Sequence, residues 1–318
     1  MINRLKRHWF FIGLVLIFGA VMVDPGGMVG PAGRWLRAHH GPPTVIFSIF
    51  FLSGLILDPA ALRAGVREGR ATLAALGVIF IAGPLIGAIL TALPVPEGVR
   101  IGLILVAIMP TTLSSGIVMT GAAGGRMAHA LVITVIANAL AVVTVPATLP
   151  LLLGTAGAGA AEAIDRVAMI RQLALLVLMP LTAGLFLRGM LGGRGRRMGK
   201  PLQRITQYLI LAMVWMAVSQ SAETLRVRPT AVGAVAVLSA GYHGMMLGVA
   251  ALTARLAGLG RGRRESVIIM GAQKTLTLAV ILQTSLFPQY GLALAVCVVH
   301  HLVMLIMDGY LTGRLKTS

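Results

Sequence analysis

Apolar runs of roughly membrane-spanning length follow one another along almost the whole chain, separated by short basic segments. A helix needs about 20 predominantly apolar residues to cross a bilayer. Only 11% of the 318 residues are charged, whereas a soluble domain has about a quarter of its residues charged. The runs also lack the alternation that membrane β-strands show. The sequence therefore predicts an all-α polytopic membrane protein.

Ten spans account for these runs. We expect them, in chain order, at about 9–23, 43–57, 71–93, 101–123, 127–153, 170–187, 205–219, 230–256, 267–287 and 292–310. With the N-terminus in the cytoplasm, the inner segments hold 19 Lys and Arg residues and the outer segments hold 7. Because cytoplasmic loops are enriched in basic residues, we expect a multi-pass protein of the plasma (inner) membrane with both termini cytoplasmic.

The segments between the spans carry most of the formal net charge of +18. We assign this charge to cytoplasmic loops and their contact with anionic membrane lipid, and we expect no binding to nucleic acid. Arg34 and Arg37 lie in an expected Gly/Pro loop, 188–204 is an expected basic loop, and 60–70 is an expected surface helix. The Gly- and Ala-rich segment 154–163 is expected to link two halves of the chain.

Two of the spans are interrupted where the middle of the bilayer would fall. The first interruption runs from Met109 to Gly116 (MPTTLSSG), and the second from Met270 to Thr275 (MGAQKT). Proline removes a backbone donor and clashes with the preceding turn, so the first helix should break at Pro110. Freed backbone groups are tolerated at that depth only inside protein or around a wet cavity. Each break is therefore a candidate binding site.

The interruptions fall in the fourth span of each half of the chain. Residues 1–163 and 164–318 would each supply five spans, and an odd number inserts the second half in the inverted orientation. Paired interrupted segments of inverted repeats point to the binding site of a secondary transporter. The C-terminal ends of half-helices favour cations and the N-terminal ends favour anions. We therefore expect a polar site where the two broken helices cross.

At these residues the chain resembles the bile acid:sodium symporter family, within it the branch of solute carrier family 10 member 7 and its bacterial relatives. The resemblance covers nearly the whole chain and is most specific at 51–55, 109–125 and 271–276. It implies ten helices, with a panel domain of spans one, two, six and seven, a core domain of the others, and broken helices that cross in the core. It also implies a transporter rather than an enzyme, one that moves small organic anions, often with sodium, by alternating access.

The two breaks and the resemblance together predict which residues form the site. The cation site would use Thr111, Thr112, Ser114, Ser115, Thr134, Asn138, Gln273 and Lys274. The substrate would contact Ser53, Ser219, Gln220 and Thr275. We expect no metal centre and no cofactor. Either sodium or a proton can be the coupling ion at this point, and the protein can form a homo-oligomer.

The sequence departs from the family at two positions of the site. A glutamate position of the family is Ile269 here, and an asparagine position is Gly116. All nine acidic residues fall in expected loops or near helix ends, so we expect no carboxylate at the midplane, although sodium favours charged oxygen ligands. We therefore expect the Lys274 ammonium to replace the cation, held by half-helix carbonyls and by the hydroxyls of the first break.

Several alternatives stay open. Lys274 could itself carry a proton through the cycle. A cation/proton antiporter-like transporter would need midplane carboxylates, and an intramembrane enzyme would need a nucleophile–base pair or a metal cluster. The absent family glutamate also permits a non-transporting membrane regulator on the same scaffold. We expect His129, His243, His300 and His301 to have structural or pore-lining roles, because they show no metal-ligand spacing with acidic partners.

Overall fold

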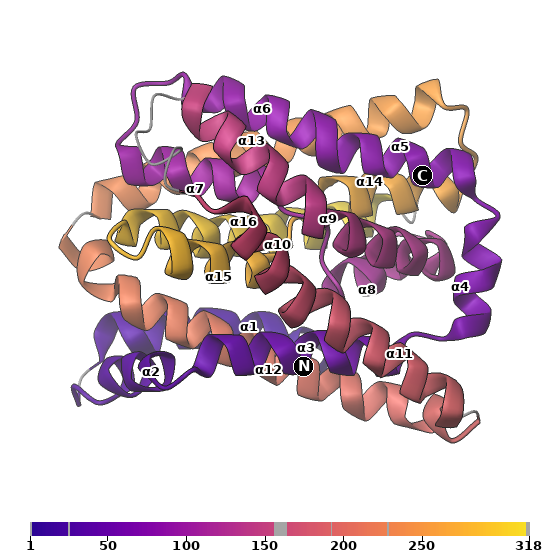
Figure 1. The fold of residues 1–318 in the computed structure, drawn as a ribbon, viewed down its shortest axis with the longest axis horizontal. Helices are drawn as coiled ribbons and strands as arrows, with labels where there is room; N and C mark the ends of the chain where they lie inside the picture. The colour runs from indigo at the N-terminus through magenta and orange to yellow at the C-terminus, as the bar shows by residue number, and fades with distance from the viewer. Residues whose placement is uncertain (1, 25, 156–163, 192, 228, 316–318) are drawn as a thin grey trace.

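The structure is a computed structural model that describes residues 2–24, 26–155, 164–191, 193–227 and 229–315 (Figure 1). Its helices, in chain order, are α1 (Ile2–Val23), α2 (Val29–Ala38), α3 (Gly41–Ile56), α4 (Pro59–Val66), α5 (Gly69–Gly77), the π-helical turn η1 (Val78–Ala82), α6 (Gly83–Thr91), α7 (Glu97–Ile108), α8 (Ser115–Ala122), α9 (Met127–Thr155), α10 (Arg166–Leu173), the π-helical turn η3 (Ala174–Leu178), α11 (Met179–Leu191), α12 (Gly193–Val227), α13 (Pro229–Leu256), α14 (Arg263–Ala272), α15 (Leu276–Leu286) and α16 (Gly291–Leu315).

Seven helical stretches in the described part of the chain are long and apolar enough to cross a membrane. They lie at expected spans three and five to ten: Gly69–Thr91, Met127–Thr155, Arg166–Leu191, Pro201–Glu223, Val232–Leu256, Arg263–Leu286 and Gly291–Leu315. Two shorter apolar helices, Ile12–Val23 and Gly41–Ile56, lie at expected spans one and two. The α7–α8 pair lies at expected span four. The chain is therefore an all-helical, multi-pass membrane protein in its described part.

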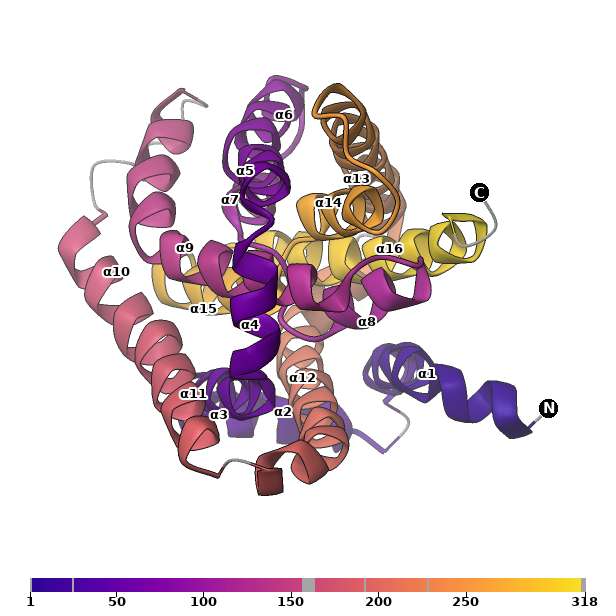
Figure 2. The same cartoon turned by 90° about the vertical axis from the view of Figure 1, so that its right-hand side faces the viewer.

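The helices form two groups with a layer between them. In Figure 1, α1, α2, α3, α11 and α12 lie along the lower side, and α5, α6, α7, α13 and α14 lie along the upper side. Figure 2 shows the same separation from the end, with α8, α15 and α16 between the groups and α4 joining them. Packing follows this division, because α3 contacts α11 and α12, whereas α7 contacts α6 and α16.

The segment expected to be a Gly/Pro loop is in fact helix α2. The Asp24 carboxylate accepts the backbone N–H groups of Met28, Val29 and Gly30 at 3.0–3.1 Å. These bonds satisfy amides that have no partner at the start of a helix. Trp215 of α12 donates its indole N–H to the Val29 carbonyl at 3.0 Å and fixes α2 against α12. The loop prediction was wrong because residue composition does not reveal this side-chain cap.

The other connecting segments differ from expectation in smaller ways. The helix expected from 60–70 is shorter, because α4 begins where Asp58 accepts the Ala60 amide at 3.0 Å and ends at Val66, before α5 starts at Gly69. The expected basic loop 188–204 is largely helical, because α11 continues to Leu191 and α12 begins at Gly193. The expected linker lies mostly outside the described residues, since α9 runs to Thr155 and the next described residue is 164.

Candidate binding site at two crossed helix breaks

The first break separates α7 from α8 at the position that the sequence predicts. α7 ends at Ile108, Met109 has an extended backbone (φ −67°, ψ 147°), and α8 begins at Ser115. The Met109 amide bonds to the Val106 carbonyl at 3.2 Å, which tightens the last turn. Pro110 follows and supplies no N–H. The last carbonyls of α7 are therefore left without helical partners.

The second break separates α14 from α15 and touches the first. Gln273 and Thr275 both have extended backbones, and α15 begins at Leu276. The Thr275 amide donates to the Pro110 carbonyl at 2.8 Å. This bond joins the two extended segments directly. The broken helices therefore cross at their interruptions, where both backbones have free polar groups.

The Lys274 side chain fills the crossing and has only 2% of its surface exposed. Its Nζ donates to the carbonyl oxygens of Ile79 and Ala107 at 2.8 Å each and of Met109 at 3.0 Å. The three bonds use all three donors of an ammonium group. The Ala107 and Met109 carbonyls belong to the C-terminal end of α7, where the helix dipole favours a positive charge. Lysine therefore occupies a cage of carbonyls.

The Ile79 carbonyl is free to accept this bond because the helix changes type at η1. In the π-helical turn the Gly83 amide donates to the Val78 carbonyl, so it does not donate to the Ile79 carbonyl as it would in an α-helix. The next residue that could serve Ile79 in a π turn is Pro84, which has no N–H. Gly83 must also be small, because a Cβ there would lie 2.6 Å from the ammonium nitrogen. Single π turns inside helices are frequent at functional sites.

The hydroxyls of the first break do not hold the ammonium. Thr112 Oγ1 accepts the Gly116 amide at 2.9 Å and donates to Gln273 Oε1. Thr111 Oγ1 is buried and has no hydrogen-bond partner in the described part of the chain. Across the described residues, no hydrogen bond joins Nζ to the hydroxyls of Thr111, Thr112, Ser114 or Ser115. The expectation that these hydroxyls bind Lys274 was wrong, because carbonyls already occupy its three donors.

A buried carboxylate reaches the second break, contrary to the sequence-based expectation. Asp308 of α16 is fully buried. It accepts a hydrogen bond from Gln273 Nε2 at 2.6 Å, and its other oxygen lies 2.8 Å from Nε2 of His243 on α13. The expectation of a midplane without carboxylates was wrong because α16 continues to Leu315, which places Asp308 inside the helix. His243 thus has an acidic partner in Asp308.

Two side chains of α9 approach the first break as expected. Thr134 Oγ1 lies 3.4 Å from the Thr112 carbonyl, and Asn138 Nδ2 lies 3.4 Å from the Thr111 carbonyl. Each also donates at 2.9 Å to a carbonyl one turn earlier in α9. Asn138 Oδ1, like Thr111 Oγ1, is buried without a hydrogen-bond partner. The break therefore has unused oxygen acceptors beside it.

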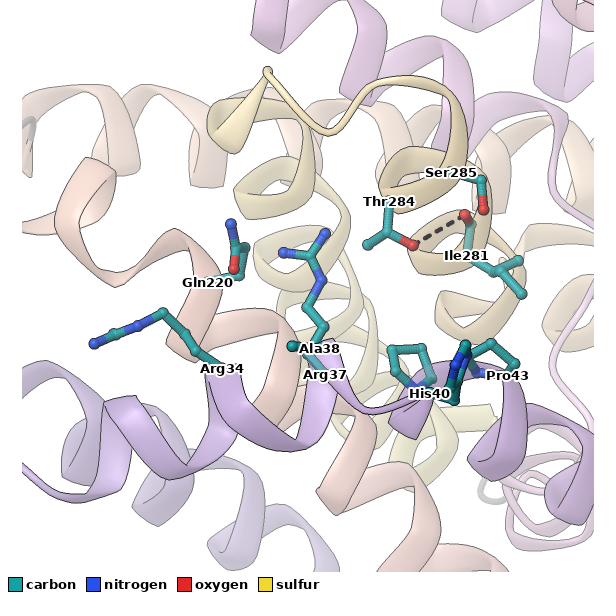
Figure 3. A pocket seen from close by; sticks show the side chains of 10 residues that line it. Arg34, Arg37, Ala38, His40, Pro43, Gln220, Ile281, Thr284 and Ser285 are labelled. Atoms are coloured by element: carbon teal, nitrogen blue, oxygen red, sulfur yellow. Dashed lines mark hydrogen bonds between the residues drawn. The ribbon is translucent and has the colours of Figure 1, made fainter.

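Three cavities follow the boundary between the two helix groups. A cavity of about 250 Å³ is lined by Ser53 of α3 and by Ser114. A narrow cavity of about 20 Å³ is lined by Ser114, Ser115 and Thr275, so it reaches the N-termini of both α8 and α15. A cavity of about 400 Å³, drawn in Figure 3, is lined by Gln220 of α12. The geometry thus brings most of the expected substrate residues to one boundary.

Ser219 is the exception among the expected substrate residues. Its hydroxyl is buried without a hydrogen-bond partner. A Cβ built on Gly33 of α2 would come within 2.2 Å of Ser219 Oγ, so these two residues are in close contact. Ser219 therefore faces α2, whereas its neighbour Gln220 faces the cavity.

The comparison with known families agrees with this geometry, in which two interrupted helices cross inside an all-helical membrane protein. A model of the SBF-like CPA transporter family matches residues 8–317. The chain belongs to this family. The SBF-like CPA transporters are transporters rather than enzymes, so the expected class is confirmed. The resemblance to the bile acid:sodium symporters and the solute carrier family 10 member 7 branch is also confirmed.

Similar proteins carry names of sodium cotransporters. The probable sodium/metabolite cotransporter BASS4, chloroplastic, of Arabidopsis thaliana is 30% identical over 280 residues, which are 83% of this chain and 64% of that protein. The protein of the same name from Oryza sativa subsp. indica is 29% identical over 288 residues, 84% of this chain and 67% of that protein. Sodium/bile acid cotransporter 7 of Xenopus tropicalis is 25% identical over 221 residues, 68% of this chain and 62% of that protein. The chain thus spans a little under two thirds of the Arabidopsis relative.

Two contributors to the site were missed from the sequence. For Ile79 the sequence contained an indirect indication, because Pro84 lies inside an apolar span. Proline has no N–H, so a carbonyl in the preceding turn loses its helical hydrogen bond. Asp308 had the signal of an acidic residue within an apolar run, and an intramembrane carboxylate is a functional candidate by default. Its distance from the second break along the chain concealed its contact with Gln273.

Proposed function

We propose that this SBF-like CPA transporter is a secondary active transporter that moves a small organic anion by alternating access. The observation that carries the proposal is the division of charge at the crossing. The C-terminal end of α7 holds the Lys274 ammonium, whereas the N-termini of α8 and α15 open into one cavity. Helix N-termini attract anions through unpaired amides and the helix dipole. An anionic group of the solute would bind on that side of the crossing.

The cavity volumes support movement of the two helix groups during transport. The narrow cavity of about 20 Å³ has room for about one water molecule. Cavities of about 250 and 400 Å³ lie beyond it and have room for a small solute. α15 connects the narrow cavity with the cavity of about 400 Å³. Thr277 lines the narrow cavity, and Ile281, one turn further along α15, lines the cavity of about 400 Å³. A solute could pass the crossing only if the groups move apart.

The proposed architecture has ten spans arranged as two inverted repeats, 1–163 and 164–318. The panel domain would comprise α1, α3, α10 with α11, and α12, and the core domain would comprise the remaining spans. Packing of α3 against α11 and α12, and of α13 against α14 and α16, supports this division. The excess of basic residues in the proposed inner segments supports cytoplasmic termini in a plasma (inner) membrane protein.

In this proposal Lys274 takes the place of a coupling cation. Its ammonium already binds three carbonyl oxygens, and the family's glutamate position is the buried apolar residue Ile269. Sodium favours several oxygen ligands that include charged ones. The proposed cation site thus needs no sodium, and Gln273, Thr134 and Asn138 support the crossing through their bonds to backbone and side chains.

A proton-coupled or cation/proton antiporter-like function is the second candidate. The contact between Asp308 and His243 favours it, because a transporter of that kind needs a buried group that can bind a proton or cation. Gln273 contacts both this pair and the first break through Thr112. A change in the charge of the pair would therefore reach the crossing.

Uptake into proteoliposomes tests these functions. Labelled small carboxylates, beginning with benzoate, are supplied with sodium or choline outside, and with or without an imposed pH gradient. We expect uptake that survives the replacement of sodium and is lost in Lys274→Gln. A sodium requirement would overturn the role of Lys274. Uptake that follows the pH gradient, and loses this dependence in Asp308→Asn, would select the second candidate. Absence of uptake of every anion by folded protein would overturn both.

A further inference from the structure

The cavity of about 400 Å³ differs from the others along the boundary because one of its walls is basic. It lies between the end of α2, the start of α3, α12 and α15 (Figure 3). Arg34 and Arg37 line the basic wall, and Gln220, Ile281, Thr284 and Ser285 line the walls opposite. No carboxylate of the described residues lines the cavity.

Arg37 is the cation at the centre of this cavity. In Figure 3 its guanidinium points between Gln220 and Thr284, whereas Arg34 points away from them along α2. Arg34 donates to the Ser219 carbonyl at 3.4 Å. Within the described residues, the side chain of Arg37 has neither an ion pair nor a hydrogen bond. Burial lowers the pKa of Arg37 from its ordinary value, but a guanidinium stays protonated in proteins.

The half-buried Arg37 guanidinium has no partner among the described residues, so its N–H donors are available to an anion that enters the cavity. Its planar fork of N–H donors matches the two oxygens of a carboxylate or phosphate. Ser285 can add a donor from the opposite wall, because its oxygen accepts a hydrogen bond from Gln172 at 3.1 Å and its own proton has no acceptor among the described residues. Pro42, Pro43 and Ile281 provide an apolar wall beside these polar groups.

We propose that this cavity binds the oxyanion head group, a carboxylate or phosphate, of the transported solute. Arg37 and Ser285 hold the head group, and the apolar wall contacts the body of the solute. Arg34 raises the positive potential at the entrance. This inference rests on the proposed transport function, and it places a first binding step one turn of α15 before the narrow cavity at the crossing.

Binding of labelled benzoate to the purified full chain in detergent tests the proposal without requiring transport. We expect Arg37→Gln to weaken benzoate binding by roughly tenfold or more, because a charge-assisted pair is lost. Arg37→Lys should retain part of the affinity, and Ser285→Ala should weaken binding by a few fold. Arg63→Gln is the matched control, since it removes an equal charge from an exposed position on α4, at the other end of the molecule in Figure 1. Benzamide, the neutral analogue, should not compete.

Phosphate and lipid distinguish the sources of the head group. Inorganic phosphate should compete with benzoate in wild type. Benzoate should also bind equally in nanodiscs of phosphatidylcholine and in nanodiscs that contain phosphatidylglycerol. Loss of binding only in the phosphatidylglycerol discs would assign the cavity to a lipid head group and overturn the proposal. Unchanged benzoate binding in both Arg37→Gln and Ser285→Ala would also overturn it. Intact, Arg37-dependent binding without uptake would instead overturn the transport function alone.

Discussion

The carbonyl cage around Lys274 predicts a large loss of stability when its ammonium is removed. In Lys274→Met, three hydrogen bonds from a charged donor are lost, each worth about 1.5–3 kcal/mol. The variant also avoids the burial of a charge, which costs about 2.5–3.5 kcal/mol at the centre of a membrane helix. The difference is a net destabilisation of about 1–6 kcal/mol. We therefore expect the Tm of the variant to fall by several degrees.

The chain provides both a probe and a control for this measurement. Cys297 is the single cysteine and is buried, so a thiol-reactive dye reports its exposure on unfolding. Gly83→Ala displaces the ammonium without removing it, because the new Cβ would lie 2.6 Å from Nζ. Gly77→Ala on the preceding helix is the control, since a Cβ there meets nothing within 4 Å. We expect Gly83→Ala to lower the Tm and Gly77→Ala to leave it unchanged or slightly raised.

Two outcomes together would refute the cage. One is a Lys274→Met protein that unfolds at the wild-type temperature. The other is a Gly83→Ala protein that behaves like Gly77→Ala. A fall in Tm for Gly83→Ala alone would show that the helices are tightly packed at that position, without any contribution from the ammonium.

Three further predictions follow from the same contacts. Sodium should raise the Tm of Lys274→Ala but not of wild type, because the emptied carbonyls can then bind a cation; equal sodium effects would contradict this. Asp308→Asn and His243→Gln should each lower the Tm, and a double-mutant cycle should show coupling of about 0.5–3 kcal/mol; additive losses would exclude their pairing. Backbone amides, with that of Gly30 first, hold the pKa of Asp24 below its ordinary value of 3.8. The Asp24 cap therefore stabilises α2 above that pH and is lost as the pH falls through the lowered pKa; Asp24→Asn should remove this acid dependence from the thermal unfolding.

The sequence was most informative where the cause of a structural feature is local. Pro110 predicts the first break by itself, because proline cannot continue the hydrogen-bond ladder. The small and polar residues around Gln273 predict the second break in the same way. Asp58 followed by Pro59 predicts the start of α4, since both residue types favour the beginning of a helix. The burial and charge of Lys274 also follow from its position within an apolar span.

The missing parts of the site depend on contacts between distant segments. Asp308 lies 35 residues from Gln273 along the chain, and their contact results from the way α16 packs beside α13 and α8. The Ile79 carbonyl became an acceptor only because a π turn and Pro84 coincide opposite Lys274. Arg37 was assigned to a loop, because the cap that makes α2 a helix is formed by a side chain before its first residue. Periodicity within one segment carries no information of this kind.

The position of Lys274 also determines what a transport cycle could move across the membrane. An ion that is bound from solution can be released on the other side, but a lysine ammonium is covalently part of the chain and returns with it. A cycle built on the carbonyl cage therefore translocates only the charge of the solute itself. Movement of an anion would then be electrogenic, and the membrane potential, together with any coupled proton gradient, would set its equilibrium distribution.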